Sequence, residues 1–143
     1  MWQEKIAMKI HFCLNMNKRI EISLLIIKPD ARLAGLEPVI RRLIEEEHLQ
    51  IELETSHLFC QEELKKMYTH RQDHLFPYYE GYLCVRPSLV LRVRGEDTSN
   101  RLSRVKSTVR YILGDTGFYN GVHSSDSEED AKRELNILGI PIG

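Results

Sequence analysis

The stretch Asn120-Gly-Val-His-Ser-Ser-Asp-Ser127 is followed by Glu128-Glu-Asp-Ala-Lys-Arg-Glu-Leu135, and together they read as a strand that passes into a helix. The acidic residues that open the second run favour a helix N-terminus, where the helix dipole is positive. His123 would then lie at the strand-to-helix junction, within reach of substrate and solvent. Glu134 could fold back and accept a hydrogen bond from the imidazole. A histidine oriented in this way can act as a base or as a nucleophile.

Hydrophobic periodicity predicts the elements of the first half of the chain. Residues 22–27 are almost entirely apolar, as in a buried central strand. Pro38 suits a first helical position, and the apolar stripe behind it predicts a helix through about residue 48. Apolar and polar residues then alternate over 49–55, which indicates a half-exposed strand.

The second half continues the alternation of helices and strands. Helices are predicted over 61–70 and 75–84, and a strand over 88–94. Asp97 would cap a short helix, and the last helix would run from about 128 to 138. This order of elements predicts an α+β sandwich.

Composition limits the class of protein. A chain of 143 residues is long enough for one domain with a real core. Its formal net charge of -1 gives no global reason to bind nucleic acid or an anionic membrane. The odd set Cys13, Cys60 and Cys84 lacks metal-type spacing and favours free thiols in a reducing compartment. No apolar run is long enough to span a bilayer, so a cytoplasmic protein is expected.

Residues 1–19 differ from the rest of the chain. They are basic, with Glu4 as the only acidic residue. Arg is scarce and Ser is absent, which disfavours a transit peptide. We interpret 1–19 as a partly disordered N-terminal extension and 20–143 as one domain. His70 and His74 are four residues apart but lack a third ligand nearby, so we interpret them as surface residues.

Four separated motifs resemble the nucleoside diphosphate kinase family. The family signature Asn-x-x-His-(Gly/Ala)-Ser-Asp-Ser, followed by a helix containing Glu, matches the stretch from Asn120 through His123 to Glu134. Residues 23–31 resemble the family's opening strand, which ends in Lys-Pro-Asp.

The other two motifs lie between these. Tyr68 and Phe76 match the family's Tyr and Phe around its nucleotide cleft, and residues 107–110 stand where the family has Gly-Thr-Ile-Arg. The resemblance spans roughly residues 20–138, and four motifs in the right order are a strong signal.

The resemblance implies a fold and a reaction. The fold would be a ferredoxin-like antiparallel sheet covered by helices. The reaction would move the γ-phosphate of a nucleoside triphosphate to a nucleoside diphosphate by a ping-pong mechanism. His123 would form the phosphohistidine and Glu134 would hold the imidazole in its reactive tautomer. Mg²⁺ would be bound with the nucleotide, and a homo-oligomer is expected. The chain contains no Gly-x-x-x-x-Gly-Lys-(Ser/Thr) loop, which excludes a P-loop mechanism.

The resemblance also implies roles for four further residues. Lys28 and Tyr68 would stabilise charge near the γ-phosphate, Phe76 would stack on the base, and Asn120 would hydrogen-bond the ribose region. Each residue taken singly also fits an ordinary structural role. Lys28 suits a solvated strand end, Tyr68 and Phe76 suit a core, and a helical Glu commonly pairs with a neighbouring Lys or Arg.

The chain departs from the family between Gly95 and the motif at 107–110. The segment containing Met-Gly-x-Thr-x-Pro is missing, and with it a Thr that contacts phosphate in the family. Arg110 is retained as a phosphate-binding cation, and Arg104 is preferred over Arg101 as the second. These departures leave an alternative open, in which the chain is an inactive or weak family paralogue that binds nucleotide as a regulatory or interaction module.

Overall fold

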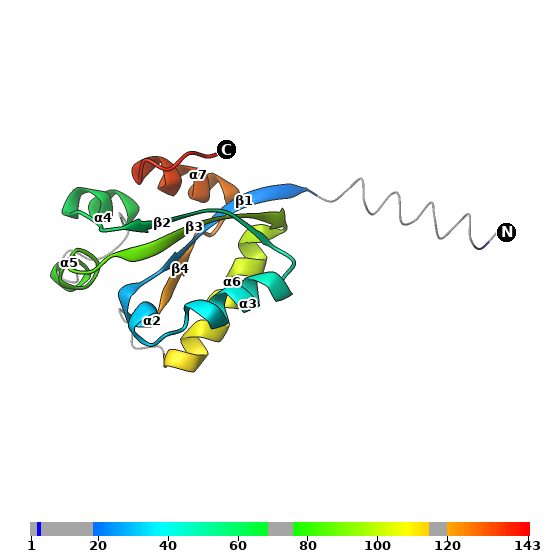
Figure 1. Cartoon of the computed structure of the whole chain (residues 1–143). Coiled ribbons are helices and arrows are strands. Elements are labelled where there is room, and N and C mark those ends of the chain that lie inside the picture. Colours follow the sequence, from blue (N-terminus) through cyan, green and yellow to red (C-terminus); the bar gives the residue numbers. More distant parts are fainter. Residues whose placement is uncertain (1–2, 4–18, 69–75, 115–119) are drawn as a thin grey trace.

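The computed structural model describes residues 3, 19–68, 76–114 and 120–143 of the chain (Figure 1). In chain order, its elements are β1 (Ile20–Ile27), α2 (Pro29–Leu33), α3 (Glu37–Glu46), β2 (Gln50–His57), α4 (Gln61–Met67), α5 (Phe76–Leu83), β3 (Ser88–Glu96), α6 (Thr98–Leu113), β4 (Val122–Ser124) and α7 (Glu128–Ile137).

The strands of the described residues form one antiparallel sheet in the order β2-β3-β1-β4. β1 pairs with β3 along its whole length, from Ile20 opposite Glu96 to Ile27 opposite Leu89. On its other side β1 pairs with the short strand β4, where Ile26 faces His123. The central position of β1 explains why its last six residues are all buried and almost all apolar.

Helices cover both faces of the sheet (Figure 1). α3 and α6 pack on one face, where their apolar residues meet Leu25, Ile27 and Leu91. α4, α5 and α7 pack on the other face against Leu24, Ile26 and neighbouring residues. The strand order and the two helical layers confirm the predicted α+β, ferredoxin-like architecture.

The predicted bounds of the last helix, about 128 to 138, are confirmed, since α7 spans Glu128–Ile137. Ser127 caps α7, because its side chain accepts a hydrogen bond from the Asp130 N–H at 3.1 Å. The helix ends before Gly139, whose φ of +70° is the left-handed conformation common after a helix C-terminus. His123 therefore lies on β4 just before α7, at the predicted strand-to-helix junction.

Three details of the secondary structure differ from the prediction. The helix after Asp97 is not short, since α6 runs for 16 residues and includes the motif at 107–110. Asp97 does precede it, with φ +50°, but its carboxylate accepts from the Asn100 side chain and makes no cap hydrogen bond. The five-residue helix α2 was not predicted, and it follows from Pro29 at a first helical position.

Some predictions fall outside the described residues. The extension over 1–19 does so except for Gln3 and Arg19, and so do His70 and His74. Within the described part of the chain, no helix is long and apolar enough to cross a membrane.

Candidate active site

The end of β1 brings Lys28 against the loop that leads into β4. The Lys28 N–H donates to the Gly121 carbonyl at 2.8 Å, and the Lys28 ammonium donates to Asn120 Oδ1 at 2.8 Å. Lys28 is only 5% exposed, and Asn120 is also buried. A buried cation needs polar partners, so this bond fixes the ammonium at one position beside β4.

Gly121 allows β4 to lie directly on α6. Its φ is +84°, and a Cβ at this position would come within 2.5 Å of Leu113 Cδ1 and 2.9 Å of Val109 Cγ1. Both the backbone conformation and the lack of space require glycine. This close approach fixes the position of β4, and with it that of His123, relative to α6 and to the end of β1.

His123 is held by a buried carboxylate. Its Nε2 lies 2.9 Å from Glu134 Oε2, and the Ser125 hydroxyl donates to the same oxygen at 2.9 Å. The Glu134 side chain is 5% exposed and that of His123 is 22% exposed. An ionised carboxylate only accepts hydrogen bonds, so Nε2 carries the proton. The lone pair of the neutral ring is then on Nδ1.

The electrostatics favour an ionised Glu134. Burial alone would raise the pKa of this carboxyl, but the hydrogen bond and charge of His123, the Ser125 hydroxyl and the charge of Arg133 together lower the pKa below its usual value. Glu134 is therefore a fixed negative charge behind the imidazole. A helical Glu ordinarily pairs with a neighbouring Lys or Arg, but the contact of Glu134 with Arg133, at 3.8 Å, is longer than its contact with His123, at 2.9 Å.

Two aromatic residues named from the sequence lie on the same side of the sheet as His123. The Tyr68 ring makes an edge contact with the His123 ring, with 5.8 Å between centroids, and stacks on Tyr79 at 5.1 Å. Phe76 begins α5, packs against the core and has the Lys65 ammonium 5.6 Å from its ring centroid. Tyr68 thus packs in the core and also belongs, with His123, Glu134 and Ser125, to a group of contacting residues that we call the His123 cluster.

Arg101 and Arg104, the two candidates for the second phosphate-binding cation, contact the end of α3. Arg104 donates two hydrogen bonds to the Glu47 carboxylate, from Nη2 at 2.8 Å and from Nε at 3.0 Å. Arg101 donates to the Glu47 carbonyl at 2.6 Å. The structure therefore brings Arg104 to the end of α3 and not to His123. Its pair with Glu47 gives it a partner already.

Another cation on α6, Lys106, was not named from the sequence. It is half-buried, and burial together with the charge of Arg110 lowers its pKa, while Asp126 and Glu134 act to raise it. Lys106 therefore lies within electrostatic reach of Glu134, the carboxylate that holds His123. The spacing of four residues between Lys106 and Arg110 could have revealed it, had the helix been predicted through both positions.

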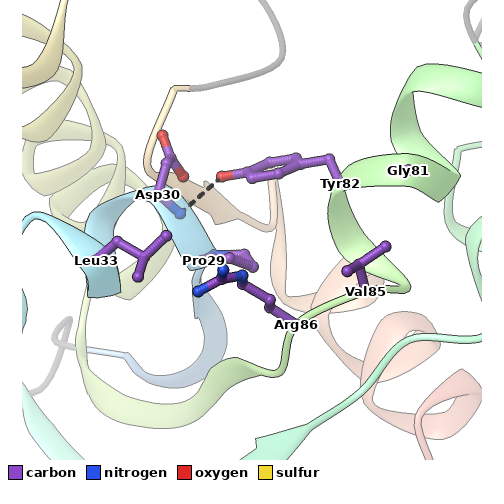
Figure 2. A pocket seen from close by; sticks show the side chains of 7 residues that line it. All are labelled: Pro29, Asp30, Leu33, Gly81, Tyr82, Val85 and Arg86. Carbon is purple, nitrogen blue, oxygen red and sulfur yellow. Dashed lines mark hydrogen bonds between the residues drawn. The ribbon is translucent and has the colours of Figure 1, made fainter.

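A separate hollow of about 250 Å³ lies between α2 and α5 (Figure 2). Its lining residues are Pro29, Asp30, Leu33, Gly81, Tyr82, Val85 and Arg86. The Asp30 N–H donates to the Tyr82 hydroxyl at 3.2 Å, which ties α2 to α5. Burial raises the pKa of the Asp30 carboxyl, although the Ala31 N–H and the Lys28 charge act in the opposite direction. The hollow is lined by none of the residues predicted for the site.

Comparison with known proteins agrees with this geometry. The family model described as Nucleoside diphosphate kinase matches residues 21–138. A nucleoside diphosphate kinase of Clostridium perfringens is 30% identical over 130 residues, which cover 83% of this chain and 91% of the relative. One of Thermococcus kodakarensis is 30% identical over 140 residues, covering 87% of this chain and 80% of the relative.

Solved structures show the same fold. The Aquifex aeolicus nucleoside diphosphate kinase superimposes with a TM-score of 0.68 at 25% identity, covering 83% of this chain and 94% of the other. The Borrelia burgdorferi enzyme, solved as a transition state mimic with vanadate and ADP, gives 0.69 at 20% identity, covering 82% and 86%. The match of family model, sequence and fold shows that this chain belongs to the nucleoside diphosphate kinase family of phosphotransferases.

Proposed function

We propose that this chain transfers the γ-phosphate of a nucleoside triphosphate to a nucleoside diphosphate through a phosphohistidine on His123. One observation carries the proposal: Nε2 of His123 is bound to the buried Glu134 carboxylate at 2.9 Å, which leaves Nδ1 as the nucleophile. A module that only binds nucleotide has no need of a histidine oriented in this way.

The reaction would proceed in two balanced half-reactions. The Nδ1 lone pair attacks the γ-phosphorus, a N–P bond forms, the bond to the bridging oxygen breaks and the nucleoside diphosphate leaves with that electron pair. A terminal phosphate oxygen of a second nucleoside diphosphate then attacks the phosphohistidine and restores the neutral ring. In the first step the imidazole becomes electron-poor, and the ionised Glu134 would stabilise it through Nε2–H.

The other predicted residues would bind and orient the substrate. Lys28 lies one hydrogen bond from Asn120, so the ammonium and the amide could meet phosphate and ribose from the same side. Tyr68, in contact with the His123 ring, would stabilise charge at the γ-phosphate. Phe76 would stack on the base, an interaction that every base offers and that predicts broad base tolerance.

Mg²⁺ would enter with the nucleotide. Within the described residues, no group of three or more His, Cys, Asp or Glu side chains could hold a metal ion. We therefore expect a cation that keeps several waters and is bound mainly by substrate phosphates, as Mg²⁺ commonly is. The ion would neutralise phosphate charge during transfer.

The test is formation of the phosphoenzyme. Purified protein is incubated with γ-labelled ATP and Mg²⁺ without acceptor, and the label on the protein is treated with acid and base. We expect acid-labile, base-stable phosphate that is discharged by any nucleoside diphosphate. His123→Ala should abolish both the label and the exchange. A matched control is His57→Ala, because His57 forms a similar pair with Glu63 at 2.8 Å outside the cluster.

The same assay tests the alternative of a nucleotide-binding module without turnover. The pairing of Arg104 with Glu47 favours that alternative, because it removes one predicted phosphate contact. Nucleotide binding without any labelled histidine would support it. Exchange that survives in His123→Ala would rule out the phosphohistidine mechanism.

A further inference from the structure

One face of α6 carries two cations side by side. Lys106 and Arg110 are four residues apart in the helix, so they are neighbours on its surface. Both are half-buried, whereas Val105 and Val109 beside them are buried against β4 and the sheet. Two positive charges at this spacing repel each other, and partial burial makes the repulsion stronger than on an open surface.

Neither cation has an anionic partner among the residues that the structure describes. Arg110 Nε is buried without a hydrogen-bond partner, and neither side chain forms an ion pair within this part of the chain. The arginine on the opposite side of the same helix differs, because Arg104 is bound by Glu47 through two hydrogen bonds. The fold pairs Arg104 with an anion, whereas the pair at 106 and 110 has no counter-ion among residues 19–68, 76–114 and 120–143.

The surroundings connect this pair to His123. The carboxylates of Asp126 and Glu134 act on the Lys106 charge, as does Arg110. Glu134 binds His123 and Ser125 through one oxygen, and among the described residues it forms no ion pair with Lys106. Gly121 adds to the closeness, since it lets β4 lie on α6 at Val109, next to Arg110.

We infer that Lys106, and not Arg104, is the second cation of α6 that binds the terminal phosphates of the nucleotide. It would form a clamp with Arg110, whose phosphate-binding role the family resemblance implies. The inference rests on the proposed function, because it assigns the ligand of the same site. Arg110 supplies a planar guanidinium that can bind two phosphate oxygens, and Lys106 supplies a compact charge that can follow the phosphate. A doubly charged terminal phosphate would relieve the repulsion between the two side chains.

The clamp predicts an effect that depends on the number of phosphates. Equilibrium binding of AMP and of ATP, the latter used as an analogue whose γ-phosphate cannot be transferred to His123, is measured for the native protein, Lys106→Met and Lys106→Arg. Lys106→Met should weaken ATP binding by about tenfold or more, the size of a charge-assisted hydrogen bond. AMP binding should change by less than about twofold, because its single phosphate does not reach the clamp. Lys106→Arg keeps the charge and should retain most of the ATP affinity.

Two further variants complete the design. Lys132→Met is the matched control, because Lys132 is an exposed lysine paired with Glu128 at 3.4 Å on α7, and it should leave ATP affinity unchanged. Arg104→Met tests the assignment made from sequence, and it should weaken ATP binding less than Lys106→Met. Equal ATP affinity in the native protein and Lys106→Met, or a greater loss in Arg104→Met, would overturn the clamp.

Binding and phosphotransfer can fail separately. If the native protein forms phosphohistidine but Lys106→Met binds ATP normally, the clamp is wrong and the proposed function stands. If no phosphohistidine forms but ATP affinity depends on Lys106, the clamp stands and the phosphotransfer proposal is wrong.

Discussion

The proposed chemistry depends on His123 and on the carboxylate that holds it. The contribution of that carboxylate, Glu134, can be tested by itself. Glu134→Gln keeps the shape and a hydrogen bond but removes the negative charge that stabilises the electron-poor ring. We expect phosphoenzyme formation to slow by about tenfold to a hundredfold, the usual effect of losing a partner that orients and polarises a histidine. Rapid-quench measurement of the first half-reaction gives this rate, and Glu129→Gln, on the same helix, is the control. An unchanged rate would mean that Glu134 has no such role.

The same substitution has a consequence for stability. Because the pKa of Glu134 is lowered in the folded protein, its ionisation stabilises the fold above the unfolded value of about 4.3, and this stabilisation is lost as the pH falls through the folded pKa. Urea unfolding of the native protein and Glu134→Gln should therefore differ most near neutral pH. The difference should shrink below about pH 4. A difference that grows in acid would contradict the lowered pKa.

At this scale, sequence reasoning identified the residues whose neighbours along the chain define them. His123 and Glu134 were found together because strand, turn and helix are contiguous. Lys28 was found through the adjacent Pro and Asp. Arg104 was preferred from its place in a motif alignment, but a side chain's direction on a helix depends on which face packs against the sheet. Because that face follows from tertiary packing with α3 and β4, the sequence did not single out Lys106, the cation proposed above.

Between elements, the contact of β4 with α6 is the most demanding. Gly121→Ala would put a methyl group within 2.5 Å of Leu113 and 2.9 Å of Val109 at a φ of +84°. Strain of about 1 kcal/mol from the backbone, and about 1–3 kcal/mol from overpacking, should lower the free energy of unfolding. Urea denaturation at neutral pH measures this loss. Gly35→Ala is a matched control at φ +71° with open space, and it should show only the backbone part.

Catalysis by Gly121→Ala shows whether the substitution moves β4 or only lowers the stability of the fold. If β4 shifts away from α6, His123 moves relative to Lys28, and phosphoenzyme formation should fall more than stability alone explains. Gly35→Ala should retain that activity, since Gly35 lies at the end of α2. Equal loss of stability in both glycine variants would show that β4 does not pack as tightly as described.

Elements were predicted well where periodicity and caps agree. The buried run of β1 and the acidic first turn of α7 are local features, and both were confirmed. The length of α6 was not predicted, because residues 97–113 carry few apolar positions. Burial of Leu102, Val105 and Val109 against the sheet holds this helix together, and such packing cannot be seen in local propensity.

At the scale of the whole molecule, the short connection from β3 to α6 bears on assembly. β3 ends at Glu96 and α6 begins at Thr98, so a single residue joins them. The resemblance to the family implies that a longer segment at this place helps to close the nucleotide cleft and makes subunit contacts in hexamers. The eight-residue strand β2 stands at the edge of the sheet and pairs only with β3 among the described strands. An edge of this length can pair with a second copy of the chain.

We therefore expect a dimer or a loose higher oligomer, with β2 as the edge through which a dimer forms. A closed two-fold dimer uses the same surface on both copies, and a stable one buries about 800 Å² on each. Loss of the longer segment should weaken the larger assembly more than the dimer, because it removes contact area from the hexamer alone. Light scattering over a dilution series, with phosphotransfer measured in parallel, tests both points. The mass should fall to a dimer on dilution while activity per chain is retained. A hexamer that persists at nanomolar concentration would show that the missing segment is not needed for assembly.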